Sequence, residues 1–240
     1  MLTGDPIGFL IGSIFLIPAV LLAVPVHELG HALAALLAGD PTSRNRGYFR
    51  PTSGLVQRLY SPYGVVAAFL LNVTWGSPAQ VNEYRLGTMG RRLIYVLGGP
   101  AANLVVAAIF GVGVRLLLGA GAFPDPRSLS QPPLGYAATV VYAIYFLNLA
   151  TFAFQLLPIP GLDGWRILET LFRDRNPKFF FNVAANQQTI WVIAAIVVLI
   201  GPLILGFSVL GFAVAIFFQP ASVGILGACT DYVVLHPCLR

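Results

Sequence analysis

The pentapeptide His27-Glu28-Leu29-Gly30-His31 lies inside an apolar run that extends over about residues 7–38. Placing an ionisable side chain in a membrane core costs roughly 2.5–3.5 kcal/mol of free energy. A histidine pair and a glutamate in such a run therefore indicate a functional site. Residues four apart share one face of a helix, and His27 and His31 can therefore hold one metal ion between them. Glu28 lies beside the pair, where it can take a proton from a metal-bound water. The stretch predicts a zinc hydrolase built inside a membrane.

The composition is typical of a polytopic membrane protein. Of the 240 residues, 57% are hydrophobic and only 10% are charged, whereas a soluble domain carries about 25% charged residues. A spanning helix needs about 20 mainly apolar residues. Four stretches clearly meet that demand, at about 7–38, 93–118, 136–157 and 187–218. We therefore expect an all-α polytopic membrane protein with four to six transmembrane helices.

Two segments leave the number of passes open. The apolar segment 63–75 is too short to span comfortably, and we expect a re-entrant or short β segment there, near the active site. The run 187–218 contains Gly201-Pro202, Gly206 and Gly211, so it forms either one kinked helix or a helix pair.

The chain shows no internal repeat and no appended soluble domain. We predict a single membrane-embedded metal-binding domain over residues 1–240, with a core at about 7–175, a C-terminal helix or helix pair at 187–218 and a polar tail at 219–240. Cys229 and Cys238 lie in that tail, where they either pair or remain free thiols.

The net charge of +5 indicates membrane topology rather than nucleic-acid binding, because cytoplasmic loops of membrane proteins collect Lys and Arg. Basic residues gather in segments 39–60, 80–92 and 158–186, whereas segment 119–135 holds only Arg127, offset by Asp125. We expect the three basic segments inside and segment 119–135 outside. The carboxyl terminus is then outside if the run 187–218 crosses once and inside if it crosses twice.

A catalytic zinc takes three protein ligands and leaves a position for water. Asp163 lies in the turn 156–164, whose prolines and glycines interrupt helical hydrogen bonding and let a side chain point back at a neighbouring helix. The charge bias places this turn on the side of the membrane where His31 lies. A site of His27, His31 and Asp163 is therefore allowed, although an Asp at this place is also an ordinary turn residue or helix N-cap.

Three segments together resemble the site-2 protease family of intramembrane zinc metalloproteases. Residues 26–32, Val-His-Glu-Leu-Gly-His-Ala, resemble its zinc-binding helix, and residues 98–103, Gly-Gly-Pro-Ala-Ala-Asn, resemble the start of the following core helix. Residues 158–164, Pro-Ile-Pro-Gly-Leu-Asp-Gly, resemble its Asp-Gly motif. Segments 39–42 and 75–82 resemble the short form that lacks PDZ and CBS domains, in which the counterpart of 75–82 lies in a membrane-re-entrant segment near the active site.

The resemblance implies that His27, His31 and Asp163 bind one zinc ion per chain and that Glu28 is the general base. It suggests a catalytic role for Asn103 near the substrate carbonyl or its oxyanion. An Asn at this position can instead have a purely structural role, in which it joins neighbouring helices by hydrogen bonding. Gln155 stands where the family often has Asn. Substrate contacts are expected from three amide side chains: Asn82, Asn148 and Gln155.

These features predict a zinc metalloendopeptidase that hydrolyses peptide bonds within or near transmembrane segments, in regulated intramembrane proteolysis. Its partners are transmembrane protein or peptide substrates and the lipid bilayer, without nucleic acid. Its place is the cell membrane, with the active site toward the cytoplasm. Three alternatives remain. One is a membrane zinc-binding or transport protein that does not need Glu28 as a base. Another is a catalytically silent protease relative that acts as a binding partner. The third is a protease of another family with Glu169 as third ligand.

Overall fold

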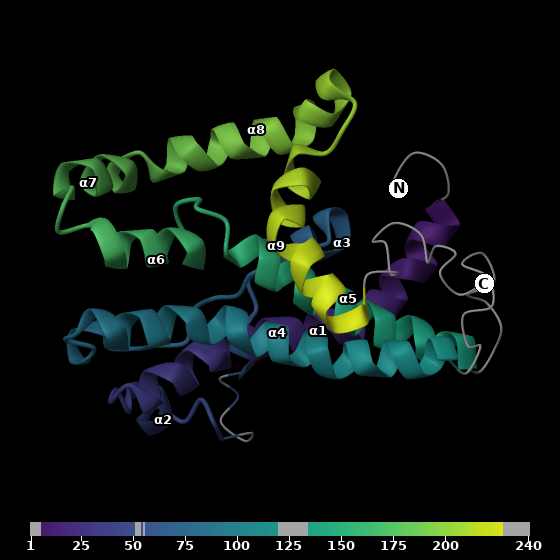
Figure 1. The fold of residues 1–240 in the computed structure, drawn as a ribbon, viewed down its shortest axis with the longest axis horizontal. Coiled ribbons are helices and arrows are strands. Elements are labelled where there is room, and N and C mark those ends of the chain that lie inside the picture. The colour runs from purple at the N-terminus through teal and green to yellow at the C-terminus, as the bar shows by residue number, and fades with distance from the viewer. Residues whose placement is uncertain (1–5, 51–53, 55, 120–133, 228–240) are drawn as a thin grey trace.

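The computed structural model describes residues 6–50, 54, 56–119 and 134–227. Cys229, Cys238 and most of the predicted outer segment 119–135 lie outside the described residues. Short helices connect some of the long ones in the described chain (Figure 1). In chain order the elements are α1 (Pro6–Leu37), α2 (Thr42–Asn45), the 3-10 turn η2 (Val56–Leu59), α3 (Pro62–Leu71), the 3-10 turn η3 (Glu83–Arg85), α4 (Met89–Gly119), α5 (Leu134–Gln155), α6 (Asp163–Phe172), α7 (Pro177–Ala185), α8 (Gln187–Leu205) and α9 (Val209–Leu226).

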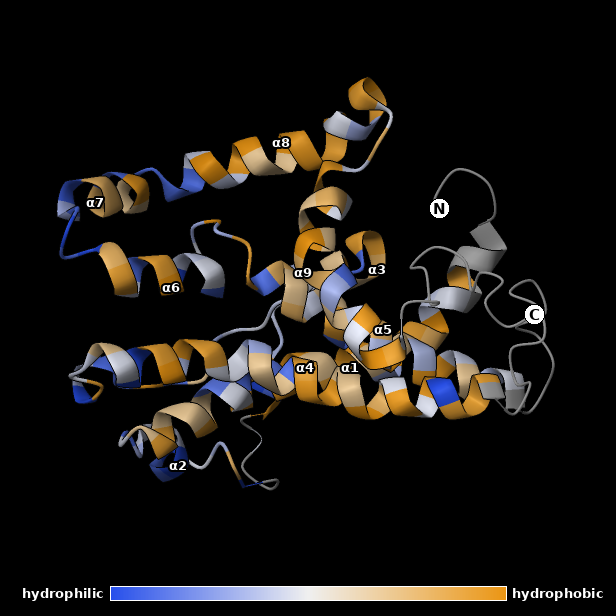
Figure 2. Ribbon diagram, viewed as in Figure 1, coloured by the Kyte–Doolittle hydropathy of each residue, from blue (hydrophilic) through white to orange (hydrophobic). Residues whose placement is uncertain are grey.

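Five of the described helices, α1, α4, α5, α8 and α9, are long and apolar enough to cross a membrane. The helical part of the fold prediction, with four to six long apolar helices, is therefore confirmed. Figure 2 shows apolar residues along most of α8, and Leu203 and Ile204 on it are 84% and 77% exposed. Such a surface is stable in lipid rather than in water. The fold is that of a multi-pass membrane protein.

The predicted run 187–218 forms two helices, α8 and α9, which settles the choice between one kinked helix and a helix pair. Gly206 ends α8 with a positive φ of 72°, a conformation that glycine adopts without steric cost. The hydroxyl of Ser208 then accepts a hydrogen bond from the Gly211 amide and caps α9.

The boundary predicted for the polar tail, residue 219, is wrong because α9 continues to Leu226. The helix continues through Pro220, and most of residues 219–226 are small or apolar rather than polar. The hydroxyls of Ser222 on α9 and Tyr145 on α5 lie 2.8 Å apart and are both buried. This polar contact ties the last described turns to the helical core.

Helices α1 and α4 cross at very close range, because glycines face one another at the crossing. A Cβ atom on Gly30 would lie 2.6 Å from the Gly98 carbonyl oxygen, and one on Gly98 would lie 2.6 Å from the Gly30 carbonyl oxygen. Small residues are what allow such an approach of two backbones in a membrane. The crossing brings the histidine-bearing turns of α1 directly against the first half of α4.

The predicted re-entrant region contains the short apolar helix α3 followed by an extended stretch. Asn72 ends α3 with a left-handed φ of 57°, and the chain then passes back over α3, where a Cβ on Gly64 would lie 1.9 Å from the Trp75 carbonyl oxygen. An isolated β-bridge joins Tyr60 to Gly76, and the described residues form no sheet. A re-entrant or short β segment in the membrane therefore stays a prediction.

Candidate metal centre

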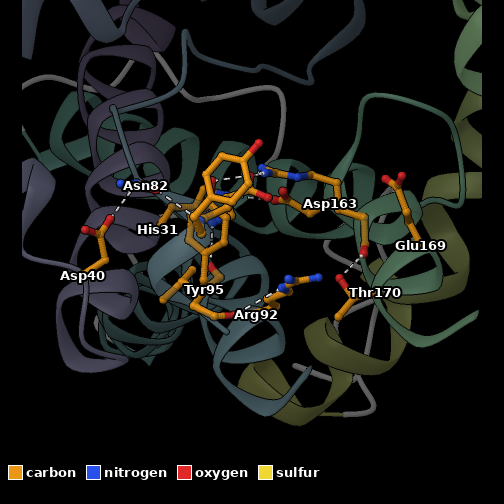
Figure 3. A network of polar contacts seen from close by, with 12 residues as sticks. His31, Asp40, Asn82, Arg92, Tyr95, Asp163, Glu169 and Thr170 are labelled. Atoms are coloured by element: carbon orange, nitrogen blue, oxygen red, sulfur yellow. Dashed lines mark hydrogen bonds and ion pairs between the residues drawn. The ribbon is translucent and has the colours of Figure 1, made fainter. Parts of the chain in front are cut away.

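The structure brings His27, His31 and Asp163 together in a buried triangle. The two Nε2 atoms are 3.2 Å apart, and each lies 3.1 Å from Oδ2 of Asp163. A tetrahedral zinc ion with bonds of about 2.0–2.1 Å separates its ligand atoms by about 3.3–3.5 Å. The three side chains therefore fit one zinc ion with very little movement. His31 and Asp163 are seen side by side in Figure 3.

Each histidine is oriented by an oxygen atom behind it. His27 Nδ1 lies 2.7 Å from Asn103 Oδ1, and His31 Nδ1 lies 2.9 Å from the Tyr95 carbonyl oxygen. Because both oxygens are acceptors, both Nδ1 atoms donate, which leaves the Nε2 lone pairs for a metal. The Gly99 amide lies 3.3 Å from His31 Nδ1, but in a helix that amide donates to the carbonyl four residues back, which is the same Tyr95 oxygen.

Asn103 lies buried behind the histidines, and its side chain does not line the cavity. Its amide nitrogen donates to the Ala23 carbonyl at 3.1 Å and to Asn148 Oδ1 at 2.9 Å, and Asn148 donates in turn to the Ile144 carbonyl. These two acceptors fix the orientation of the Asn103 amide, so its oxygen faces His27. Both amides join helices α1, α4 and α5 behind the metal position.

Two glycines make room for the side chains of the site. A Cβ on Gly99 would lie 2.3 Å from His31 Nε2, and a Cβ on Gly76 would lie 2.6 Å from Glu28 Oε1. Gly99 belongs to a segment that the sequence already singled out. Gly76 also belongs to such a segment, 75–82, but its proximity to Glu28 arises only when the extended stretch after α3 folds back onto α1.

Asp163 reaches the histidines because α6 begins there. Gly161 has a φ of 97° and Leu162 is extended, which turns the chain into the helix. A Cβ on Gly164 would lie 2.1 Å from the Leu156 carbonyl oxygen, so the turn is closed tightly. Burial by itself raises the pKa of Asp163, but the adjacent imidazoles of His31 and His27 outweigh burial and hold this pKa well below its ordinary value. Asp163 can therefore complete the triangle as a carboxylate beside the two imidazoles.

A cavity of about 270 Å³ opens onto the triangle and is lined by Glu28 and Gln155 as well as by the three candidate ligands. Glu28 is buried on the same wall as the histidines. The structure does not bring Asn82 or Asn148 into this cavity. The side chain of Asn82 instead accepts a hydrogen bond from the Tyr84 amide, and it faces a separate hollow that also contains Arg46 and Arg92.

Arg166 also lines the cavity, and sequence reasoning missed it. Its Nη2 donates to the Glu83 carboxylate and, at 3.2 Å, to the Tyr95 hydroxyl, and its Cζ lies 5.0 Å from the centre of the Tyr95 ring. Burial lowers the pKa of Arg166, but Tyr95 and Glu83 together raise it above its ordinary value, so the side chain is a permanent cation. Arg166 follows Asp163 by three residues on the same helix, and this spacing could have predicted that the two side chains lie close together.

Glu169, the other third ligand considered, is not part of the triangle. Its carboxylate pairs with Arg173 at 2.9 Å on the surface of α6, whereas Asp163 lies beside both histidines. The geometry therefore offers a metal two imidazoles and one aspartate, which are three protein ligands, the number found in catalytic zinc sites that keep one position open.

Comparison with known proteins finds relatives that are named as zinc metalloproteases. A protein of Bacillus subtilis (strain 168) named "Putative zinc metalloprotease YwhC" is 30% identical over 160 residues, which are 65% of this chain and 68% of the relative. The chain belongs to the site-2 protease family. The family recognised from the sequence motifs is thereby confirmed.

Two further relatives carry the name "Putative zinc metalloprotease Rip2". The one from Mycolicibacterium smegmatis is 29% identical over 197 residues, covering 81% of this chain and 70% of the relative. The one from Mycobacterium tuberculosis is 28% identical over 180 residues, covering 73% of this chain and 64% of the relative. No family model matches the chain, and no solved structure matches it. The names of the relatives support a metalloprotease that uses zinc.

Proposed function

We propose that this site-2 protease family member is an intramembrane zinc metalloendopeptidase that hydrolyses peptide bonds within or near transmembrane segments, in regulated intramembrane proteolysis. The observation that carries the proposal is the buried triangle of His27, His31 and Asp163 with the Glu28 carboxylate in the same cavity, inside apolar helices. A bound zinc ion would lower the pKa of its water to about 7 and polarise a peptide carbonyl.

Glu28 is placed to act as the general base. Its carboxylate lies on the helix turn between the two histidines and faces the space that Gly76 leaves open. It takes the proton of the attacking water and delivers it to the leaving amine, a type of catalysis worth about 10²–10⁴ in rate. Asn103 and the Tyr95 carbonyl hold the imidazoles still during these steps.

The substrate is a transmembrane helix that unwinds before it is cut. A helix hides its carbonyls in internal hydrogen bonds, so none of them can be attacked until the helix opens. The segment 75–82, which precedes η3, lines the cavity through Trp75, Gly76, Pro78 and Ala79 and offers an extended edge to which an unwound peptide adds as a strand.

The proposed location is the cell membrane, with the cavity toward the cytoplasm. Arg46 after α1, Arg92 at the start of α4 and Arg173 at the end of α6 line one open hollow. Figure 2 shows hydrophilic residues gathered around α2, at the start of α4 and between α6 and α7. The excess of Lys and Arg in cytoplasmic segments supports this orientation.

The test compares wild type with Glu28→Gln, purified in detergent and incubated with a panel of single-pass membrane proteins while bound zinc is measured. We expect zinc near one per chain in both and at least about 100-fold slower cleavage by Glu28→Gln. Glu169→Gln is the matched control, because it makes the same chemical change outside the triangle, and it should keep both properties.

Asp163→Asn should lose zinc and cleavage together, because it removes the anionic ligand. Zinc binding by the wild type without cleavage of any substrate in the panel would contradict the proposal. That result would favour a zinc-transporting or partner-binding role instead.

A further inference from the structure

The extended segment 79–82 is held along one edge by two polar side chains from the chain that follows α1. Asp40 Oδ2 accepts a hydrogen bond from the Asn82 amide at 2.6 Å, as Figure 3 shows. The Ser43 hydroxyl donates to the Gln80 carbonyl at 2.5 Å. Asp40 and Ser43 are both buried, so these are not loose surface contacts.

The hydrogen bonds determine which way the other backbone groups point. In an extended chain, the N–H and C=O groups of alternate residues point to opposite edges. Gln80 and Asn82 point toward Ser43 and Asp40, so the groups of Ala79 and Val81 point to the other edge. Ala79 is buried, Gln80 is exposed, and Val81 and Asn82 are both half-buried.

The edge formed by Ala79 and Val81 is free. Among the described residues, their amide and carbonyl groups have no hydrogen-bond partner. Ala79 lines the metal cavity and also an adjoining hollow of about 520 Å³, whose other wall includes Gly161 and Arg166. An unpaired backbone edge therefore borders two hollows that share lining residues, one of which contains the metal position.

The two oxygens of Asp40 have different partners. Oδ1 accepts from the amide and the hydroxyl of Thr42, at 3.1 and 2.6 Å, which stabilises the local turn. Oδ2 instead reaches the Asn82 amide, 42 residues away in the chain. Stabilising the turn after α1 requires only the first oxygen, so the second one is available to orient the segment beside the cavity.

We propose that Asp40 and Ser43 are positioning residues that turn the Ala79–Val81 edge toward the cavity and thereby set how an unwound substrate is received. The inference rests on the proposed peptidase function and deepens it, because neither residue touches the metal position. Asp40→Asn keeps an oxygen for Thr42 but places an amide N–H₂ against the Asn82 amide, so two donors face one another. Ser43→Ala removes the only donor that the Gln80 carbonyl has among the described residues.

The experiment is steady-state cleavage of a single-pass substrate by the full chain, together with bound zinc. We expect Asp40→Asn to raise KM about tenfold while kcat stays within about twofold, since one hydrogen bond to a charged group is lost. Ser43→Ala should change KM in the same direction, and it carries the test if Asp40→Asn does not fold. Thr42→Val, which removes a bond to the same carboxylate but not to the segment, should keep the KM of the wild type.

Backbone hydrogen exchange supplies a measurement that does not depend on turnover. In a Glu28→Gln background with bound, uncut substrate peptide, residues 79–81 should become protected, and Asp40→Asn should remove that protection. An unchanged KM in both Asp40→Asn and Ser43→Ala, or no protection at residues 79–81, would overturn the inference. Cleavage by Glu28→Gln at the rate of the wild type would overturn the proposed function instead.

Discussion

Asn103 decides which nitrogen of His27 faces the metal position. The sequence suggested that this amide lies near the substrate carbonyl, but its oxygen is bound to His27 Nδ1 and its nitrogen to the Ala23 carbonyl and Asn148. We therefore expect Asn103→Ala to weaken zinc binding about 10–100-fold, as loss of a partner behind a ligand does. Competition with a chelator measures the affinity. Unchanged zinc affinity with a lower kcat would show that Asn103 acts on the substrate instead.

Gly99 and Gly76 make room for different parts of the site, so their alanine variants should lose different properties, zinc binding in one and catalytic rate in the other. Gly99→Ala places a methyl group on His31 Nε2 and should abolish zinc binding. Gly76→Ala presses on the Glu28 carboxylate and should keep zinc while lowering kcat. Gly224→Ala, where nothing lies within 4 Å, is the control. Equal zinc loss in the Gly76 and Gly99 variants would contradict this division of roles.

The α1–α4 crossing is the element on which the histidine pair depends. Gly98→Ala would put a Cβ 2.6 Å from the Gly30 carbonyl oxygen, and backbone cannot move aside as a flexible side chain does. Overpacking of this kind costs about 1–3 kcal/mol of unfolding free energy. We expect a lower midpoint of thermal unfolding in detergent. Gly90→Ala, in the first turn of the same helix and without neighbours within 4 Å, should not lower it.

The sequence-based prediction of the site agrees best with the structure where the residues concerned lie on one helix. His27 and His31 share a helix, so their spacing alone predicts a metal-binding pair. Asp163 is 132 residues from His31, so helix periodicity could not pair it with the histidines. Its turn and the charge bias only allowed a ligand role, which the resemblance to a family then implied. The break at Gly206 was visible as a cluster of glycines, but whether glycine bends a helix or ends it depends on the φ that the surrounding structure imposes.

Other features of the site exist only after the chain has folded. Nothing in the sequence indicates that Asn103 points at His27 rather than at a substrate, because both roles need the same buried amide. The edge that the segment 79–82 presents is set by Asp40 and Ser43 across a turn, and a change of one residue in register would reverse it. Period-2 alternation over so few residues is too weak a signal to read alone.

At the scale of the whole molecule, the polar candidate metal site lies within an apolar exterior. The described chain offers lipid a surface such as that of α8, with Leu203 and Ile204 almost fully exposed, while the triangle of His27, His31 and Asp163 is buried. Water and an unwound peptide must meet in the same cavity for the proposed hydrolysis to occur. The central claim is therefore that a bond inside a transmembrane segment is cut by water with the help of Glu28.

The most direct test is mass spectrometry of the products formed from a single-pass substrate in liposomes prepared in ¹⁸O-labelled water. The account predicts a cut within or at the edge of the apolar segment and one ¹⁸O atom in the new carboxyl terminus. It also predicts that the product is absent when Glu28→Gln, still loaded with zinc, replaces the wild type. The same product from both proteins, or cleavage confined to the soluble part of the substrate, would contradict the account.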